Sequence, residues 1–483
     1  MSSLPRKIAY NVVFSSVAKI AGTVFALVGI GFITRYLGKD GFGDYSTVLA
    51  FFAFFSALAD LGLYSISTRE ISRPGSDEKS ILGNVFTIRI AVSVLIVIVS
   101  PLIIIFFPYS SAVKTGILLS ALAYLFSSAY SVLIGLFQKR LAMDKVAIGE
   151  FVGKIGQLAV VVITVKNNLG FLFIVSSLLA NMILSFLVVY LWSRKYLIFK
   201  LKLDFSVWKK FLLESYPVGI SAVIVFAYFK LDTILLSILK TSSDVGIYNA
   251  AYKVLENIVF FPAMFIGLVM PLMSRYIFHD RNKFLTIANK TFKVFLIITA
   301  PLVVGILFLA KDIIHLIGGA DFSESVSVLR ILSFAMAFIF FGNFFTNVII
   351  AGSLQKKLMK ILFICALFNI SLNLVLIPRF SFKGAAITSA LTEFLVAVLS
   401  GFLCWKLLRY RPRPEKLFPI AVSAGVMAVF LYLFSGLGFA ALVVLSSTIY
   451  FALLWLFRAI STEEIAGLIN KKGEEAREYE TVP

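Results

Sequence analysis

The sequence predicts an all-α integral membrane protein with about fourteen transmembrane helices. These are expected to form two like-oriented six-helix bundles around a central cavity, plus a C-terminal helix pair. Three observations predict this fold class: the composition, the series of long apolar stretches, and an internal repeat. Of the 483 residues, 60% are hydrophobic and 14% are charged, whereas soluble domains carry about 25% charged residues. A soluble core cannot hide so much apolar surface, so the bilayer is the natural solvent.

The apolar stretches set the number of helices, because a membrane span needs roughly 20 mostly apolar residues. The first stretch is interrupted by Lys19 and continues to Thr34, which favours an uncleaved span over a signal peptide. Fourteen stretches have the required length, and the loops between them are short. The predicted spans are 10–34, 45–67, 84–107, 114–137, 147–165, 169–192, 215–239, 245–272, 291–311, 326–352, 358–378, 384–407, 417–435 and 438–457.

The basic residues orient these spans. Alternate loops and the C-terminal tail hold 31 lysines and arginines, and the remaining loops hold 8. Because the basic side faces the cytoplasm, we expect a multi-pass protein of the cell membrane with both termini in the cytoplasm. The net charge of +20 then comes mostly from basic residues that face the inner leaflet. Binding of nucleic acid is not expected.

Residues 193–214 separate spans six and seven. Leu201, Phe205, Trp208 and Leu212 recur there at helical spacing, with lysines elsewhere on the helical wheel. This pattern predicts a helix lying in the cytoplasmic interface. It serves either as a plain connector between two halves or as a sensor of lipid headgroups.

Two short phrases occur twice. GFGDY (41–45), at the entry to span two, matches DVGIY (244–248), at the entry to span eight, with an offset of 203. IGLFQKR (134–140), at the end of span four, matches IAGSLQKK (350–357), at the end of span ten, with an offset of 217. Both pairs lie six spans apart, and six is even, so the two copies have the same orientation. This predicts a duplication with a pseudo-two-fold axis along the membrane normal.

The repeat and the linker together predict the domains. These are an N-terminal six-helix bundle, a cytoplasmic linker helix, a C-terminal six-helix bundle, an appended pair formed by spans thirteen and fourteen, and a charged cytoplasmic tail. Their expected bounds are 1–192, 193–214, 215–410, 411–460 and 461–483.

Charged residues within the spans are the candidate functional residues, because a charge at the bilayer centre costs about 2.5–3.5 kcal/mol and needs a partner, water or a function. The deep cations Lys19, Lys230 and Lys253 suit a cavity wall for an anionic substrate. The acids Asp60, Asp232, Glu256 and Glu393 would balance these charges or titrate during transport, with H⁺ or Na⁺ as a possible coupling ion. Lys253 and Glu256 are three residues apart on one helix face, so they could simply neutralise each other.

The motifs of common enzymes are missing from the sequence. It has no Walker A phrase, H-E-x-x-H or G-x-S-x-G. His279 and His315 fall in loops on opposite sides of the membrane, and Cys365 and Cys404 fall in apolar runs, so neither pair makes a metal site. We therefore expect no enzyme activity, no cofactor and no metal.

Two stretches resemble a known family. R-Y-L-G (35–38), G-F-G-x-Y (41–45) and D-L-G (60–62) resemble the first two helices of the polysaccharide-transporter flippases (O-antigen and lipid-linked oligosaccharide flippases). This family belongs to the multidrug/oligosaccharidyl-lipid/polysaccharide exporter superfamily. The stretch 216–254, with Asp232 and the phrase G-x-Y-x-x-A-x-K (246–253), resembles helices seven and eight of the same family.

The resemblance implies a flippase for polyprenyl-linked oligosaccharide, which serves surface polysaccharide or protein glycosylation. It also implies that Lys19, Arg35, Lys230 and Lys253 meet the pyrophosphate or acidic sugars of the substrate. Arg35 lies near the outer mouth and equally suits the anchoring of a helix end. Two alternatives stay open: an ion-coupled exporter of small amphiphiles, and a membrane enzyme of polysaccharide assembly, against which the short outer loops count.

Overall fold

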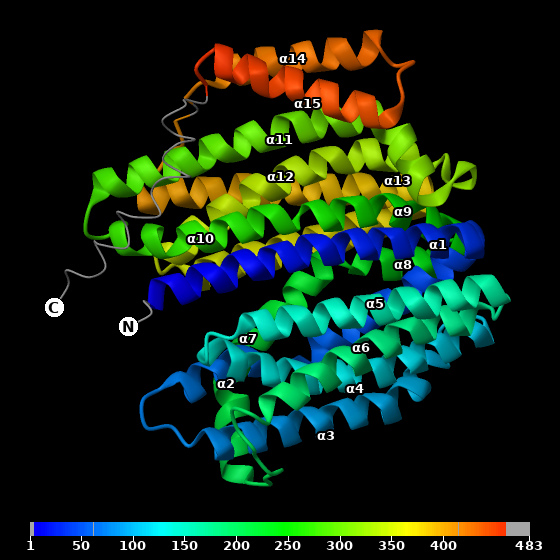
Figure 1. The fold of residues 1–483 in the computed structure, drawn as a ribbon, viewed down its shortest axis with the longest axis vertical. Helices are drawn as coiled ribbons and strands as arrows, with labels where there is room; N and C mark the ends of the chain where they lie inside the picture. Colours follow the sequence, from blue (N-terminus) through cyan, green and yellow to red (C-terminus); the bar gives the residue numbers. More distant parts are fainter. Residues whose placement is uncertain (1–3, 61, 414, 460–483) are drawn as a thin grey trace. The chain divides into compact units, whose positions relative to one another are not determined.

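The structure is a computed structural model that describes residues 4–60, 62–413 and 415–459, apart from the side chains of residues 4–17, 19, 20 and 268. Every regular element in these ranges is a helix (Figure 1). In chain order they are α1 (Leu4–Asp60), α2 (Leu63–Ser72), α3 (Glu78–Ile104), α4 (Ser111–Lys139), α5 (Met143–Asn167), α6 (Phe171–Ser193), α7 (Phe205–Phe229), α8 (Leu231–Leu239), α9 (Ser242–Ile258), α10 (Phe260–Tyr276), α11 (Arg281–Gly318), the 3₁₀ turn η1 (Ala320–Phe322), α12 (Ser325–Ala351), α13 (Gln355–Leu408), α14 (Leu417–Leu433) and α15 (Phe439–Leu456).

Eleven of the described helical stretches are long and apolar enough to cross a membrane. Two of them, Ala21–Asp60 and Gln355–Leu408, each overlap two predicted spans. The backbone leaves the helical conformation inside both, at Gly38 (φ 64°) and at Ser381 (φ 48°). α14 is apolar but slightly shorter than the others. When the two long stretches are divided at these breaks and α14 is included, the predicted fourteen helices are confirmed.

The break at Gly38 reverses the chain. In Figure 1, α1 runs from the N-terminus at the left to the right of the view, and α2, which follows it directly, lies back at the left. Gly38 has a positive φ of 64°, a conformation that glycine adopts without steric cost. Two antiparallel spans are therefore joined by a turn of minimal length.

The helix predicted over 193–214 forms only in its second half. Residues 197–204 are not helical, and α7 begins after Asp204, whose side chain accepts hydrogen bonds from the first backbone N–H groups of the helix. Asn84 of α3 holds this segment in place. Its Oδ1 accepts from the Asp204 N–H at 3.0 Å and from the Trp208 indole at 3.2 Å. The segment is thus tied to α3 as irregular chain, which the helical spacing of its apolar residues did not indicate.

The described residues form two compact units. The first unit comprises Met1–Ala250, Leu316–Phe322 and Ala366–Ala385, and the second comprises the remaining segments. In the first unit, α5 packs tightly on α6 because glycines line the contact. A Cβ at Gly149, Gly153 or Gly156 would collide with side chains of α6. Small residues at this spacing let membrane helices approach closely.

In the second unit, the pair α14–α15 packs on α11. Ile297 and Leu309 of α11 are buried against Met427 of α14 and Tyr450 of α15. The Tyr450 hydroxyl donates to the Ile297 carbonyl at 2.9 Å. Figure 1 shows this pair at the edge of its unit, next to α11.

One of the two repeated phrases is wrongly aligned by sequence. α4 and α12 end in the same cap: Leu141 (φ 51°) and Ser353 (φ 56°) follow the last turn in the left-handed conformation. In both cases the next backbone N–H donates to the carbonyl five residues before it. These caps are 212 residues apart, not 217. Gln138 therefore lies in the last turn of α4, whereas Gln355 opens α13.

Candidate functional site

The other repeated phrase forms a direct contact within the first unit. Gly43 of α1 packs on the carbonyl oxygen of Ser242, and Gly246 of α9 packs on the carbonyl oxygen of Lys39. The approach is so close that a Cβ on either glycine would overlap that oxygen. Ser242 follows Lys39 by 203 residues, as Gly246 follows Gly43. The contact is therefore reciprocal, and the two copies of the phrase pack on each other about a local two-fold axis.

Two flanking contacts repeat this symmetry. The Thr34 hydroxyl of α1 donates to the Ile317 carbonyl at 2.6 Å. The Ser237 hydroxyl of α8 lies 2.8 Å from the Tyr109 hydroxyl. Ser237 follows Thr34 by 203 residues, and Ile317 follows Tyr109 by 208. Each copy of the first repeat helix thus reaches across to the other copy's half. We call the contacts of Gly43, Gly246, Thr34 and Ser237 the two-fold closure.

A second pair of contacts lies beside the closure, within each half. The Gly170 N–H donates to the Tyr36 hydroxyl at 2.9 Å, and the Lys240 ammonium donates to the Pro378 carbonyl at 2.9 Å. Gly170 and Pro378 are again 208 residues apart. The chain turns near both of them. The symmetry of the repeats therefore extends to the turns that support the closure.

Arg35 lies at the end of α11. Its guanidinium donates to the Leu316 carbonyl at 2.7 Å and to the Ile317 carbonyl at 3.4 Å. The last carbonyls of a helix have no partner within that helix, so Arg35 supplies a C-terminal cap. This is the anchoring role that the sequence left open beside substrate binding, and it ties Arg35 to the two-fold closure.

Asp232 joins α8 to α9. Its side chain is buried, with 1% exposed, and accepts hydrogen bonds from the Tyr248 hydroxyl and from the Thr233 N–H. Tyr248 is the tyrosine of the second repeated phrase. Lys230 lies two residues before Asp232, at the break between α7 and α8, and is half-buried. The acid and the cation predicted for this span therefore occupy a helix break next to the closure.

Lys253 and Glu256 form an ion pair on α9. The ammonium lies 2.7 Å from the Glu256 carboxylate, and the lysine side chain is 17% exposed. The pairing expected from their spacing is present. Glu393 on α13 is buried, with 6% exposed. The side chain of Lys19 lies outside the described residues.

Asp60 and Arg89 form an ion pair that the sequence did not indicate, because they lie on different predicted spans. The Arg89 Nη2 donates to Asp60 Oδ1, and its Nη1 donates to the Ser131 hydroxyl at 2.6 Å. Arg89 is 2% exposed and the Asp60 side chain is 32% exposed. The Arg89 side chain is thus enclosed between α3 and α4, and the more exposed member of the pair is Asp60.

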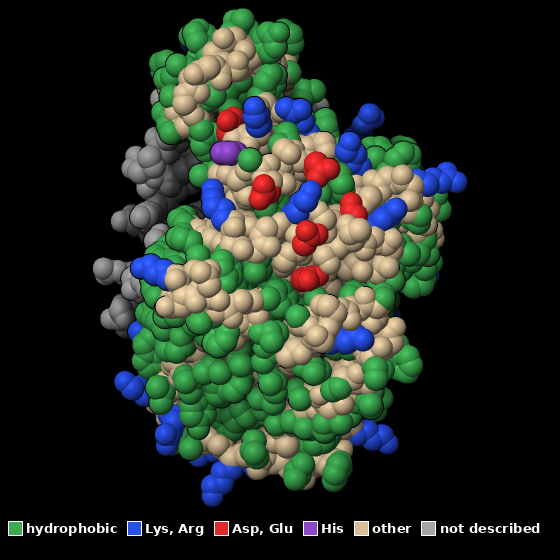
Figure 2. All heavy atoms as spheres, turned by 90° about the vertical axis from the view of Figure 1, so that its right-hand side faces the viewer, with side chains coloured by type: hydrophobic (Ala, Val, Ile, Leu, Met, Phe, Trp, Pro, Cys, Tyr) green, Lys and Arg blue, Asp and Glu red, His purple; other side chains and the backbone are tan. Residues whose placement is uncertain are grey.

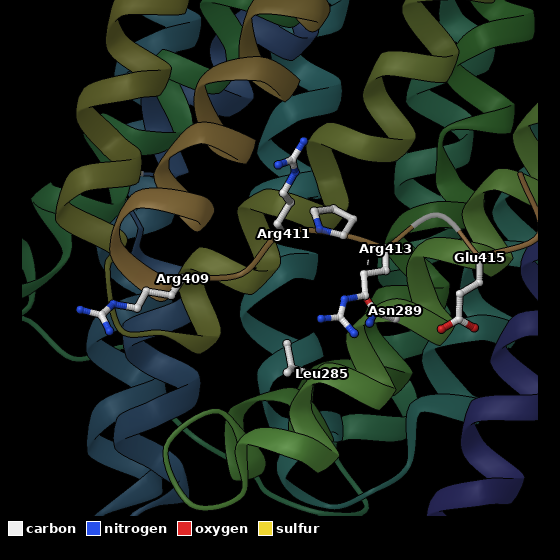
Figure 3. Close-up of a pocket in the computed structure, with 7 residues that line it drawn as sticks. Leu285, Asn289, Arg409, Arg411, Arg413 and Glu415 are labelled. Carbon is white, nitrogen blue, oxygen red and sulfur yellow. Dashed lines mark hydrogen bonds between the residues drawn. The ribbon is translucent and has the colours of Figure 1, made fainter.

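A surface pocket of about 640 Å³ lies in the second unit, between α11 and the α13–α14 loop. It is lined by Leu285, Asn289, Arg409, Arg411, Pro412, Arg413 and Glu415. Tyr410 anchors this loop by donating to the Asn289 side chain at 3.1 Å, and burial raises the pKa of its hydroxyl. Figure 3 shows Arg413 beside Asn289, whereas Arg409 and Arg411 point away from it. The arginines do not converge, so this pocket is not the candidate site.

Metal binding finds no support in the described part of the chain. No group of three or more His, Cys, Asp or Glu side chains there could hold a metal ion.

The sequence matches two family models. The model described as polysaccharide biosynthesis protein covers residues 8–277, which is more than half of the chain. The MatE model covers residues 217–375.

Two curated relatives come from Haloferax volcanii. The probable flippase AglR is 29% identical over 43% of this chain, which covers only 44% of AglR's length. The probable low-salt glycan biosynthesis flippase Agl15 is 23% identical over 91% of this chain and 92% of its own length. Among solved structures, the lipid II flippase MurJ in an inward closed conformation matches with a TM-score of 0.74 and 16% identity, over 92% of this chain and 98% of MurJ. At that identity, the likeness shows the fold.

The family match extends over α1 to α10, including Thr34, Gly43, Ser237 and Gly246 of the two-fold closure and both resembling stretches. The fold agrees with it, as that of a multi-pass helical membrane protein. The chain therefore belongs to the polysaccharide biosynthesis protein family, within the multidrug/oligosaccharidyl-lipid/polysaccharide exporter superfamily.

Proposed function

We propose that the protein is a flippase that moves polyprenyl-(pyro)phosphate-linked oligosaccharide from the cytoplasmic to the outer leaflet, for surface polysaccharide or glycoprotein assembly. One observation carries the proposal: the relative named as a glycan biosynthesis flippase aligns with more than nine-tenths of both chains. We assign the protein to transport and not to enzyme catalysis.

The two-fold closure supports alternating access as the mechanism. In such transporters, two like-oriented repeats rock about a site near the bilayer midplane. One end must be closed while the other is open, and the reciprocal contact of Gly43 and Gly246 is a closed end. At its centre two glycines meet backbone carbonyls, so no side chains interlock at that point.

The charged residues of the spans are proposed to serve the substrate. Lys19, Lys230 and Lys253, with Arg35 near the closure, would attract the phosphates or acidic sugars. Asp60, Asp232, Glu256 and Glu393 would balance these cations, and H⁺ or Na⁺ would couple through one of them. The opposite charges seen in pairs, Lys253–Glu256 and Arg89–Asp60, keep the interior near neutrality before an anion enters.

We further propose that both termini lie in the cytoplasm. The closure is then at the outer side, because α1 runs from the N-terminus to the break at Gly38. Figure 2 faces the side toward which α1 runs in Figure 1, and basic and acidic side chains are intermixed there. The proposed orientation rests on the positive-inside rule, which places the more basic loops in the cytoplasm.

An ion-coupled exporter of small amphiphiles is the second candidate, and the MatE match over residues 217–375 favours it. If the protein is such an exporter, its deletion would make cells sensitive to cationic drugs. The same drugs would stimulate ion flux in vesicles that contain the protein. A flippase would show neither response to such drugs, even with its own transport coupled to H⁺ or Na⁺.

The deciding experiment is a leaflet assay. The gene is deleted, polyprenyl-linked glycans are extracted, and their membrane face is determined with a membrane-impermeant reagent that modifies sugars. We expect accumulation on the cytoplasmic face and loss of surface glycan, both reversed by a plasmid copy. Unchanged lipid-linked pools with intact surface glycan would contradict the proposal.

A further inference from the structure

On one edge of the Arg89 guanidinium, only one of two N–H donors has a partner. Its Nη1 donates to the Ser131 hydroxyl and its Nη2 donates to Asp60. The Nε–H has no partner among the described residues, although the side chain is 2% exposed. Buried polar groups nearly always find a partner. A buried guanidinium with a free donor is therefore a candidate for binding a further acceptor.

The free donor lies next to the one that Asp60 occupies. In the planar guanidinium, the Nε–H and one Nη2–H point along the same edge, and this edge matches two oxygens of a carboxylate or phosphate. Asp60 uses only half of it, because its second oxygen, Oδ2, accepts from the Gly62 N–H at 3.2 Å. Asp60 thus neutralises Arg89 without filling its fork.

Asp60 is also the partner that is placed to move. It is the last residue of α1, and the chain breaks before α2 at Gly62 (φ 74°). Its side chain is 32% exposed, whereas Arg89 lies inside the continuous helix α3. The carboxylate therefore lies between the guanidinium and the more open side of the pair. Rotation of Asp60 would release the guanidinium edge with no change in α3.

Two further buried groups lie on the same side of α4. Ser131, which binds Arg89, is preceded at helical spacing by Ser128 and Tyr124. The Ser128 and Tyr124 hydroxyls are buried, and among the described residues Tyr124 reaches no partner other than the neighbouring Ser128 hydroxyl. The α4 face next to Arg89 thus offers two hydroxyl groups to a ligand that accepts several hydrogen bonds.

We infer that Arg89 is the receptor for a phosphate oxyanion of the substrate, and that Asp60 occupies this receptor between transport cycles. A phosphate group presents two oxygens to Nε and Nη2 at once, whereas Asp60 presents one. The exchange makes and breaks no covalent bond: the carboxylate leaves the guanidinium and turns to its exposed side, and the phosphate takes its place. The inference rests on the proposed function, since it assigns the site for the phosphate of that substrate.

The test measures the binding of inorganic pyrophosphate to the purified full-length protein at constant ionic strength. Asp60→Asn removes the competing charge and keeps the shape of the side chain. We expect it to bind pyrophosphate at least about tenfold more tightly than the wild type, because it loses a nearby like charge. Adding Arg89→Gln to this variant should abolish the gain. Equal affinity of the wild type and Asp60→Asn would overturn the inference.

Two controls make the result specific. Glu214→Gln removes an acid that pairs with Arg69, which is 48% exposed, and should leave the affinity unchanged. A gain equal to that of Asp60→Asn would show a general charge effect and overturn the site. If Asp60→Asn is not recovered folded, Arg89→Lys carries the test alone: it keeps the charge but loses the fork, and its affinity should fall about tenfold. Unchanged affinity would again reject Arg89.

The leaflet assay separates this inference from the proposed function. If deletion shifts the glycan to the cytoplasmic face but Asp60→Asn does not change pyrophosphate affinity, only the Arg89 site is wrong. If Asp60→Asn binds more tightly but deletion leaves the glycan unchanged, the anion site stands and the flippase assignment fails.

Discussion

At the scale of single residues, the ion pair of Lys253 and Glu256 gives the clearest test of the proposed cations. We expect Lys253→Ala to abolish transport in the leaflet assay without loss of folded protein. The exchange of both residues, Lys253→Glu with Glu256→Lys, keeps a pair of the same spacing but moves the cation by about one turn. If Lys253 binds substrate, the double variant with the two charges exchanged is inactive in transport, like Lys253→Ala. Transport by the double variant would show that the ion pair has a purely structural role.

Asp204 allows a prediction about pH at the start of α7. The hydrogen bond from Ser206 and the N–H of Val207 lower the pKa of the Asp204 carboxyl below its ordinary value of 3.8. A carboxyl with a lowered pKa stabilises the folded helix end at neutral pH, and this stabilisation is lost as the pH falls through the lowered value. We expect the hydrogen-exchange protection of the first amides of α7 to fall several-fold at that pH.

Two variants check this assignment. Asp204→Ala should show the reduced protection already at pH 6, because the cap is removed. Asp204→Asn keeps an accepting oxygen and should show protection that does not vary with the charge of residue 204. A pH response in Asp204→Asn equal to that of the wild type would contradict the role of the carboxylate.

How far single residues can be predicted from sequence depends on how close their partners are in the chain. Lys253 and Glu256 are three residues apart, so helix geometry alone predicted their pairing. Arg89 and Asp60 are 29 residues apart, on different helices, and no local spacing brings them together. Asn84, which holds the chain before α7, was missed for the same reason. Partners from distant helices require the packing itself.

At the scale of elements, the close approach of α1 and α9 predicts a strong effect of single methyl groups. Gly43→Ala or Gly246→Ala places a Cβ against a backbone carbonyl that cannot rotate away. Overpacking of this kind costs about 1–3 kcal/mol, and here it destabilises the closed state. We expect a cysteine introduced at Thr34 to react faster with a membrane-impermeant thiol reagent in either variant than in the parent.

The matched control for this prediction is Gly425→Ala on α14, where a Cβ would meet nothing within 4 Å. It should leave the labelling rate unchanged. The native cysteines Cys365 and Cys404 are buried, so the background is low. Equal labelling of Gly43→Ala and the parent would show that the glycine contact does not hold the outer side closed.

The sequence predicted the helices well and the connections between them poorly. Apolar length alone identified every span, because the bilayer sets that length. It did not show that residues 197–204 are not helical, because this depends on hydrogen bonds to Gly83 and Asn84 of α3. It also misaligned the phrase at 350–357, since a glutamine and two basic residues suit a helix end and a helix start on the cytoplasmic side equally well.

At the scale of the whole molecule, the predicted orientation can be tested with single cysteines in a variant lacking Cys365 and Cys404. We expect Gly75, in the turn between α2 and α3, to be protected from impermeant reagent in intact cells, and Asn168, between α5 and α6, to react. Both turns have positive φ and are exposed, so the two sites differ mainly in the side on which they lie. The opposite result would invert the topology and place the two-fold closure in the cytoplasm.

The reciprocal contact of Gly43 and Gly246 also bears on the origin of the chain. A contact in which residue i of one copy meets residue j of the other, and j meets i, has the symmetry of an isologous dimer interface. A chain of half this length with one copy of the glycine phrase already carries both surfaces of such an interface. Two copies of such a chain could associate side by side in parallel orientation with no new interface. Joining the two genes would then preserve an existing dimer, while leaving each half free to acquire its own charges.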